Sequence, residues 1–313
     1  MNSITFVPCN NGLGHIRRLS ILANNLKTSK KIFFFLDIKK KNKFHLKNKI
    51  KKKLVSKKIS KYSNYIVKKI NSKESNIIFT DNIIDKGLIF KNTVLYANFL
   101  WEEILNKNKL NLKGLKKTKI KIFSNYLFSN IKTKVKINKV GFFGKYKSNK
   151  NTNGILIATG SAKSKLLKLY KKKIVKILEK NKFHENKIYL DPSIYEHKLK
   201  KYSVIKANFS NRMYSKISIA IIKPGMGTIE ECLKRGIPII PIMKNENKEF
   251  RYNAQVLIRE NLGFDLKNFD KIIEFINKNI SNAFFFNKFR LKCKNLKWNG
   301  ELKIIKYLHN FTY

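Results

Sequence analysis

The sequence lacks any long apolar run and has few cysteines, and each shortage excludes a class of protein. No apolar stretch approaches the roughly 18–20 residues that a membrane-spanning helix needs. The three cysteines, Cys9, Cys232 and Cys293, lie far apart and follow no metal-binding pattern. The first residues start at once with a strand-like run, without the charged and apolar regions of a secretory signal. We therefore expect a cytoplasmic protein.

Acidic residues are also scarce, since 19 Asp and Glu stand against 69 Lys and Arg and give a formal net charge of +50. AT-rich codons explain part of this excess but not all, because Asp and Glu codons are compatible with the same bias. An anionic membrane surface, a phosphorylated substrate or nucleic acid could each be the partner. Nucleic acid is the weakest of the three, because the basic residues are scattered and the aromatics lie mainly in apolar runs.

The length of 313 residues suits two domains, and short apolar runs alternate with helical patterns in both halves. This alternation predicts an α/β fold with a parallel sheet in each half. We expect domains at residues 1–145 and 154–295, a polar linker at 146–153, and a C-terminal helix at 296–313 that packs back on the first domain. The predicted strands are Ile4–Cys9, Lys31–Asp37, Asn76–Thr80, Thr93–Phe99, Lys121–Phe123, Lys139–Phe143, Gly154–Ala158, Lys187–Leu190, Tyr202–Ala207, Ile217–Ile222 and Ile237–Met243.

Two glycine-rich turns, Asn11–Arg18 and Lys223–Glu231, each join an apolar run to a helical pattern. A strand–glycine turn–helix unit directs backbone N–H groups and the positive helix end at an anion such as phosphate. Two such units indicate two domains that face one ligand across a cleft. The first turn is a weak signal by itself, because it lacks the third glycine of a dinucleotide fingerprint and the Lys-Ser/Thr of a P-loop.

Polar residues near the first turn are candidates for chemistry. His15 follows the first strand, and the helix N-terminus beside it favours the neutral imidazole, which can accept a proton. Arg18 lies one helical turn further on and faces either the cleft or solvent. Asp81 follows the run Asn76–Thr80, where a structural cap is the simpler interpretation, and Trp101 follows another strand.

The second turn carries more candidates. Gly225 and Gly227 permit close approach to a diphosphate, while Thr228 can cap the helix or bind a phosphate oxygen. Of Glu230 and Glu231, we expect one to complement the helix dipole and the other to accept hydrogen bonds from a ribose diol. The turn that contains Gly160 and Ser161 is a third candidate for phosphate contact.

Three segments resemble the GT-B glycosyltransferase superfamily. They are NGLGHIRRLSILANNL, ILIATGSAKS and IIKPGMGTIEECLKRGIPIIPI with EFRYNAQVL after it. Within the superfamily they are similar to the lipid-linked N-acetylglucosaminyltransferase of peptidoglycan synthesis and to the nucleotide-sugar hydrolase of pseudaminic acid synthesis. The resemblance implies two Rossmann-like domains, the first for the acceptor and the second for a nucleotide-sugar donor.

The resemblance also implies roles for individual residues. His15 falls on the acceptor-side histidine, Glu231 on the residue that holds the ribose, and Met213 near the base. In relatives the helix at Glu249 often begins Glu-Gln, but Phe250 stands here in place of Gln. The donor-binding set is Gly160, Ser161, Met213, Gly225, Met226, Gly227, Thr228, Glu231, Glu249 and Asn253, and the acceptor-side set is Gly12, Gly14, Arg18, Asp81 and Trp101.

We therefore expect a metal-independent, cofactor-free transferase that moves a sugar from a nucleoside diphosphate donor to a hydroxyl acceptor. The donor would be a UDP-sugar such as UDP-GlcNAc, and the acceptor a glycan or lipid-linked molecule of the cell envelope. The basic segment Lys39–Lys61 would hold the protein on the anionic inner membrane surface. A nucleotide-sugar hydrolase is the first alternative, because the form GxGHxxR from Gly12 to Arg18 is particularly like the pseudaminic acid enzyme. A basic nucleic-acid-binding protein is the second.

Overall fold

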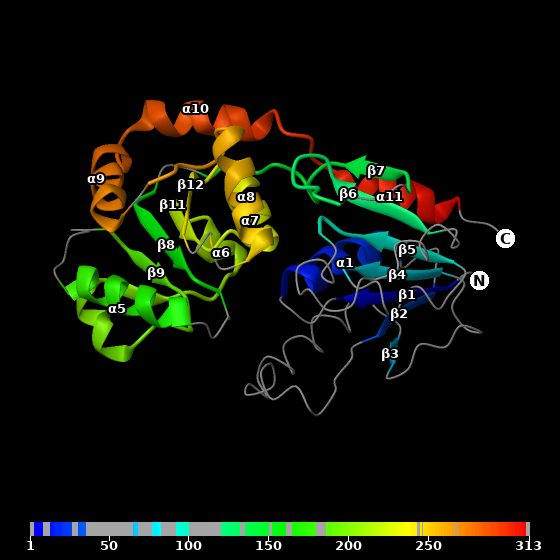
Figure 1. Ribbon diagram of the computed structural model, residues 1–313, viewed down its shortest axis with the longest axis horizontal. Helices are drawn as coiled ribbons and strands as arrows, with labels where there is room; N and C mark the ends of the chain where they lie inside the picture. The colour runs from blue at the N-terminus through cyan, green and yellow to red at the C-terminus, as the bar shows by residue number, and fades with distance from the viewer. Residues whose placement is uncertain are drawn as a thin grey trace. The chain divides into compact units, whose positions relative to one another are not determined.

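The computed structural model shows two compact units, one formed by Met1–Gly144 with Lys297–Tyr313 and the other by Lys145–Leu296 (Figure 1). We call them unit 1 and unit 2. The described residues are 3–8, 13–26, 31–35, 65–67, 77–82, 92–99, 120–131, 135–149, 152–160, 165–179, 186–242, 245, 247–266 and 268–310.

Unit 1 is built on a seven-stranded parallel sheet in the order β3-β2-β1-β4-β5-β6-β7. Strands β1, β4 and β5 are buried along their whole length, which explains why most of their residues are apolar. The strands are β1 Ser3–Pro8, β2 Lys31–Phe35, β3 Tyr65–Val67, β4 Ile77–Asp81, β5 Thr93–Tyr96, β6 Lys121–Asn125 and β7 Ile137–Val140.

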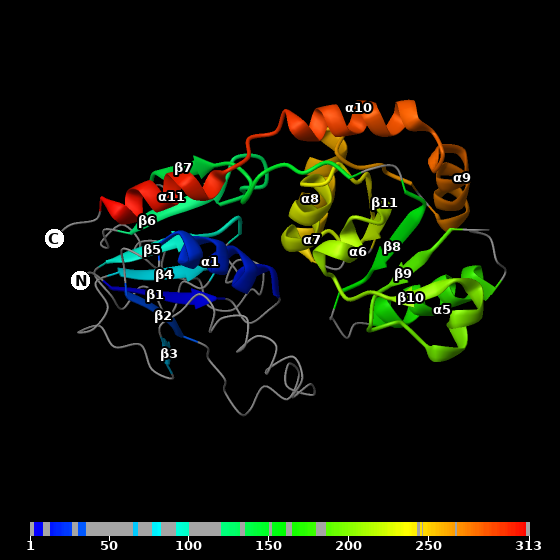
Figure 2. The same cartoon turned by 180° about the vertical axis from the view of Figure 1, so that it is seen from behind.

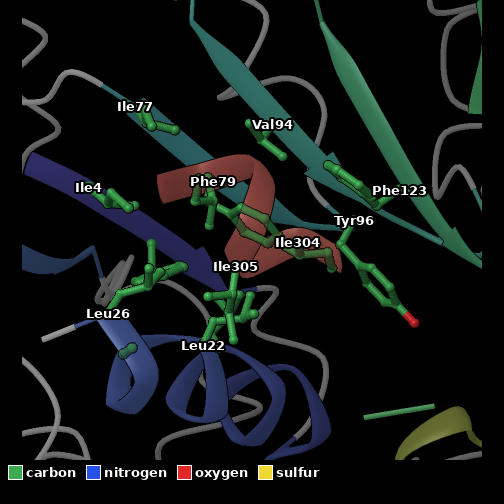
Figure 3. Packing of buried hydrophobic residues seen from close by; sticks show 14 of the residues in the cluster. Ile4, Leu22, Leu26, Ile77, Phe79, Val94, Tyr96, Phe123, Ile304 and Ile305 are labelled. Atoms are coloured by element: carbon green, nitrogen blue, oxygen red, sulfur yellow. The ribbon is translucent and has the colours of Figure 1, made fainter. Parts of the chain in front are cut away.

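Two helices from opposite ends of the chain, α1 (Leu13–Leu26) and α11 (Gly300–His309), share the core of unit 1. Figure 3 shows Leu22 of α1 and Ile304 and Ile305 of α11 among the apolar side chains of the sheet. The carboxylate of Glu301 accepts a hydrogen bond from the backbone N–H of Gly144 at 2.8 Å. The last helix therefore completes the unit that the first residues begin.

Unit 2 is built on a five-stranded parallel sheet in the order β10-β9-β8-β11-β12 (Figure 2). Its strands are β8 Gly154–Ala158, β9 Ile188–Leu190, β10 Val204–Lys206, β11 Ile217–Ile222 and β12 Ile239–Pro241. Its helices are α5 Lys165–Glu179, η1 His197–Tyr202, α6 Asn211–Tyr214, α7 Met226–Leu233, α8 Lys248–Arg259, α9 Phe269–Asn279 and α10 Ala283–Lys294. Two α/β units with parallel sheets confirm the predicted fold class.

The sequence predicts a linker at residues 146–153. Its described residues form hydrogen bonds with unit 2. The backbone N–H of Lys147 donates to the carbonyl of Lys234 at 2.8 Å, and that of Asn149 donates to the carbonyl of Arg235 at 3.1 Å. The side-chain amide of Asn149 also donates to the carbonyl of Tyr214 at 2.7 Å. These hydrogen bonds attach the segment to unit 2, so it is part of that unit.

Each sheet has one place where the strand order reverses, between β1 and β4 in unit 1 and between β8 and β11 in unit 2. In open parallel sheets, ligands bind outside the carboxyl ends of the strands at this place, because neighbouring connections leave to opposite faces. The chain leaves β1 toward α1 and leaves β11 toward α7, so both predicted glycine turns lie at such a reversal.

Candidate functional site

Three side chains meet at the strand reversal of unit 1. His15 lies in the first turn of α1, and its Nδ1 is 2.9 Å from Oδ1 of Asp81, the last residue of β4. Arg18 Nε donates to Asp81 Oδ2 at 3.1 Å, and Arg18 Nη2 to Asp81 Oδ1 at 3.2 Å. The Nη2 atom also lies 3.1 Å from Nδ1 of His15. We call this set the His15 cluster.

The cluster is buried around a charged carboxylate. Burial alone would raise the pKa of Asp81, but the charges of Arg18 and His15, with the hydrogen bonds from both, outweigh it and lower the pKa below 3.8. When the imidazole is neutral and carries its proton on Nδ1, Asp81 accepts a hydrogen bond from Nδ1–H of His15, and Nε2 keeps an open lone pair. The His15 side chain keeps 15% of its surface exposed, whereas Asp81 keeps 1%. His15 can therefore exchange a proton with a ligand while Asp81 orients it.

Arg18 points into unit 1, so of the two predicted orientations the one toward solvent is wrong. Its guanidinium carbon lies 5.2 Å from the ring centroid of Tyr96, the last residue of β5, and the residue is buried. The aromatic face and the carboxylate of Asp81 compensate for the lost hydration of the guanidinium. Asp81 is likewise more than a cap, because it holds two side chains at once.

In unit 2, the turn after β8 is held by a carboxylate that the sequence analysis did not select. The backbone N–H of Gly160 donates to Asp191 Oδ2 at 2.9 Å, and Gly160 has a φ of +70°, which favours glycine. Asp191 follows β9, and its Oδ1 accepts from the backbone N–H and the hydroxyl of Ser193. The run Asp191-Pro192-Ser193 after an apolar strand is a turn signal that could have revealed it.

The second glycine turn leaves two backbone donors at the start of α7. The N–H groups of Gly225 and Thr228 donate within the turn, to Lys223 and Gly225 respectively. Those of Met226 and Gly227 open the helix and have no backbone acceptor in the described residues. A Cβ atom added at Gly225 would meet nothing within 4 Å. The fold therefore does not need glycine at 225, and the space beside it is open.

Lys223 brings a positive charge to the same place. A Cβ added at Gly160 would lie 3.0 Å from its Nζ atom, so the ammonium group lies against the turn at Gly160. The same Nζ atom lies 4.9 Å from the ring centroid of Phe250, the residue that replaces the Gln of relatives. The sequence does not predict a role for Lys223, because a single lysine in so basic a chain does not mark a functional site.

Glu231 lies in α7 and is paired with Arg235, one turn further along the chain. Arg235 Nη1 donates both to the Glu231 carboxylate and to its backbone carbonyl, and Nη2 donates to Asn211 Oδ1 at 2.9 Å. The guanidinium carbon also lies 5.0 Å from the ring centroid of Tyr214. A carboxylate offers about four acceptor sites, so an orienting arginine leaves capacity for a further donor.

The remaining candidates of unit 2 lie at different depths. Asn253 of α8 is buried, and its Nδ2 donates to the carbonyl of Pro224 at 2.9 Å, so it fastens α8 to the glycine turn. Met213 is buried in the short α6, where its N–H donates to Ser210 Oγ at 3.1 Å. Glu249 is half-buried in the first turn of α8.

The candidates thus form one group in each unit, and some cannot be placed. Gly14, the second residue of α1, directly precedes His15. Gly12, Trp101 and Ser161 lie outside the described residues, as do Cys9 and the basic segment Lys39–Lys61. In the part of the chain that the structure describes, no three His, Cys, Asp or Glu side chains are grouped to hold a metal ion. No described helix is both long and apolar enough to cross a membrane.

Comparisons with known proteins agree with this architecture. Residues 154–306 match the glycosyltransferase family 28 C-terminal domain, whereas no protein of curated function is similar in sequence. Among solved structures, LpCGTa in complex with UDP is similar over 99% of both chains, with a TM-score of 0.67 and 9% identity. MurG of Acinetobacter baumannii is similar over 99% of both chains, with a TM-score of 0.61 and 10% identity.

The spinosyn rhamnosyltransferase SpnG, complexed with thymidine diphosphate, is similar over 98% of this chain and 100% of its own, with a TM-score of 0.58 and 10% identity. At such identities the likeness shows the fold, and the family match covers the residues of unit 2 and most of α11. The resemblance to the GT-B glycosyltransferases is confirmed: the chain has their fold, and its residues 154–306 match the glycosyltransferase family 28 C-terminal domain.

Proposed function

We propose that the protein is a glycosyltransferase whose unit 2 binds a nucleoside diphosphate sugar and whose unit 1 supplies the general base. The observation that carries the proposal is the turn at Gly225, where open space, the amides of Met226 and Gly227 and the ammonium of Lys223 occur together. These groups suit a diphosphate, because amides at a helix N-terminus and a fixed cation stabilise its negative charge. Nucleoside diphosphates are bound in two of the similar structures.

The rest of the donor would extend from this turn. Glu231, oriented by Arg235, would accept hydrogen bonds from the ribose hydroxyls, and the α6 segment with Met213 would lie near the base. Gly160 and Lys223 would contact the diphosphate from the β8 side. The charge on the departing diphosphate grows as the glycosidic bond breaks, so these donors stabilise the transition state more than the ground state.

His15 would act on the acceptor. Its Nε2 lone pair would take the proton of the attacking hydroxyl, while Asp81 stabilises the imidazolium that forms. The proposed donor is a UDP-sugar, with UDP-GlcNAc as the first to test, and the proposed acceptor is a glycan or a lipid-linked molecule. We further propose that the enzyme acts in the cytoplasm and needs no metal ion.

Hydrolysis of the nucleotide sugar is the second candidate, and Arg18 is the observation that favours it. In the form GxGHxxR that resembles the pseudaminic acid enzyme, this arginine is the last residue, and here it binds Asp81 beside His15. A base held in this way would activate water as well as an alcohol.

The experiment follows the label of radiolabelled UDP-sugars with and without hydroxyl acceptors, lipid-linked ones included. Transfer predicts acceptor-dependent movement of the sugar, whereas hydrolysis predicts free sugar in both cases.

His15→Ala should lower turnover about a hundredfold or more and leave donor affinity nearly unchanged, since His15 belongs to unit 1. His309→Ala, an exposed histidine of the same unit, is the matched control. Unchanged turnover in His15→Ala would contradict its role as the base.

A further inference from the structure

The outer face of α10 carries apolar and basic side chains that unit 2 does not use. Phe286, Phe289 and Cys293 are buried and hold the helix against the unit. On the other face, Phe284 is 78% exposed and Leu291 is 60% exposed. In both views of the molecule α10 runs along the outside of unit 2, with no described element of that unit on its outer side (Figures 1 and 2).

These exposed residues form one stripe. Phe284, Lys288 and Leu291 follow each other at spacings of four and three, which places them on the same side of a helix. Lys292 and Lys294 are exposed and flank the stripe on its two sides. The helix sequence AFFFNKFRLKCK contains no acidic residue. We call Phe284, Lys288, Leu291, Lys292 and Lys294 the α10 face.

Single exposed apolar residues are normal, but an aromatic and an aliphatic side chain on one stripe among lysines are a pattern of surfaces that bind a partner. The partner must accept both apolar groups and positive charge. Nucleic acid supplies the charge, but Leu291 cannot stack on its bases, since stacking needs an aromatic side chain. The headgroup layer of an anionic bilayer supplies phosphate charge and, directly beneath it, acyl chains.

We propose that the α10 face binds the surface of an anionic lipid membrane. Phe284 and Leu291 enter the boundary between headgroups and acyl chains, and the three lysines extend their stems along them to reach the phosphates. The chain's formal net charge of +50 adds long-range attraction to the same surface. This membrane site goes beyond the proposed function, and its test is independent of sugar transfer.

Co-sedimentation with vesicles tests the proposal on the full chain. We expect binding to vesicles of phosphatidylglycerol with phosphatidylcholine, weaker binding as salt is added, and none to phosphatidylcholine alone. The pair Phe284→Ser with Leu291→Ser should lower the partition coefficient at least tenfold, and so should Lys288, Lys292 and Lys294→Gln together. All five positions are exposed, so unchanged thermal unfolding should show that the variants are folded.

Helix α5 of the same unit offers matched controls. Leu169→Ser removes an apolar side chain that is 48% exposed, and Lys172, Lys173 and Lys176→Gln remove three exposed charges. A loss of binding in the α10 variants that greatly exceeds the loss in the controls supports the proposal. Equal losses in both sets, or α10 variants that bind like the wild type, would overturn it.

A second measurement reports insertion directly. The tryptophan of Phe284→Trp should shift its emission to the blue on anionic vesicles and be quenched by brominated acyl chains, whereas that of Leu169→Trp should not. Two other results would also overturn the proposal: α10-dependent binding to oligonucleotides with none to vesicles, or an α10-dependent dimer in vesicle-free sedimentation.

Discussion

Asp81 shows how one residue at a strand end can hold a site together. Its carboxylate contacts both His15 and Arg18, which lie one turn apart on α1. The sequence predicts His15 and Asp81 at the carboxyl edge of a sheet, because each follows an apolar run, and leaves Arg18 facing either the cleft or solvent. It does not predict that they touch, since contact depends on β1 and β4 being neighbours, a property of the strand order.

Replacing Asp81 with Asn should destabilise unit 1 by about 3 kcal/mol at pH 7, because Arg18 loses a buried partner. The pKa of Asp81 in the folded protein lies below 3.8, so the carboxylate stabilises the fold fully above that pH. Its contribution is lost as the pH falls through the lowered pKa. Urea unfolding at pH 7, 5 and 3 should therefore show the deficit of the variant shrinking at pH 3. A deficit that is the same at every pH would contradict the account.

Gly225 is the residue that best separates binding from folding. A methyl group added there meets nothing within 4 Å, and the backbone has an ordinary φ of −79°. Gly225→Ala should therefore keep the melting temperature within about 2 °C of the wild type, yet weaken nucleoside diphosphate binding tenfold or more by blocking the approach. Calorimetric titration with UDP measures the binding.

Gly160→Ala is the contrasting variant, because Gly160 has a φ of +70° and lies against Lys223. It should lower the melting temperature as well as affinity. If Gly225→Ala binds UDP as tightly as the wild type, the diphosphate does not lie at this turn.

At the scale of elements, apolar runs predict the strands that are buried on both faces, but they do not predict short strands at the edge of a sheet. Ile217–Ile222 coincides with β11, because a central parallel strand is buried on both faces and is therefore mostly apolar. Strand β3 has three residues at the edge of its sheet, within a lysine-rich sequence, and no run marks it. The short α6 and η1 have too few residues to show a helical period.

Helix α11 provides the element-scale prediction, since it completes the core of unit 1 from the far end of the chain. Ile304 is fully buried there beside α1, whereas Leu302 on the same helix is 56% exposed. Ile304→Ala should lower the free energy of unfolding of unit 1 by about 2–4 kcal/mol, and Leu302→Ala by less than about 0.5 kcal/mol. Chemical unfolding followed by circular dichroism compares them. Equal effects would show that α11 does not form part of this core.

For the whole molecule, the sequence predicts two α/β units and a glycine turn between a strand and a helix in each. It does not predict the groups that surround the turns: Asp191 holds Gly160, Arg235 pairs with Glu231, and Lys223 lies on Phe250. These contacts join residues from different elements, and a single lysine or arginine among 69 basic residues carries no local signal. The proposed function therefore depends most on whether unit 2 binds a nucleoside diphosphate.

Thermal unfolding of the wild-type chain with a panel of ligands tests that claim most directly. A ligand that binds only the folded protein raises the melting temperature with its concentration. We predict a rise with UDP or another nucleoside diphosphate, a larger rise with the matching nucleotide sugar, and little or none with the nucleoside or with inorganic phosphate alone. If no nucleoside diphosphate or nucleotide sugar raises the melting temperature at millimolar concentration, the proposed donor site is wrong.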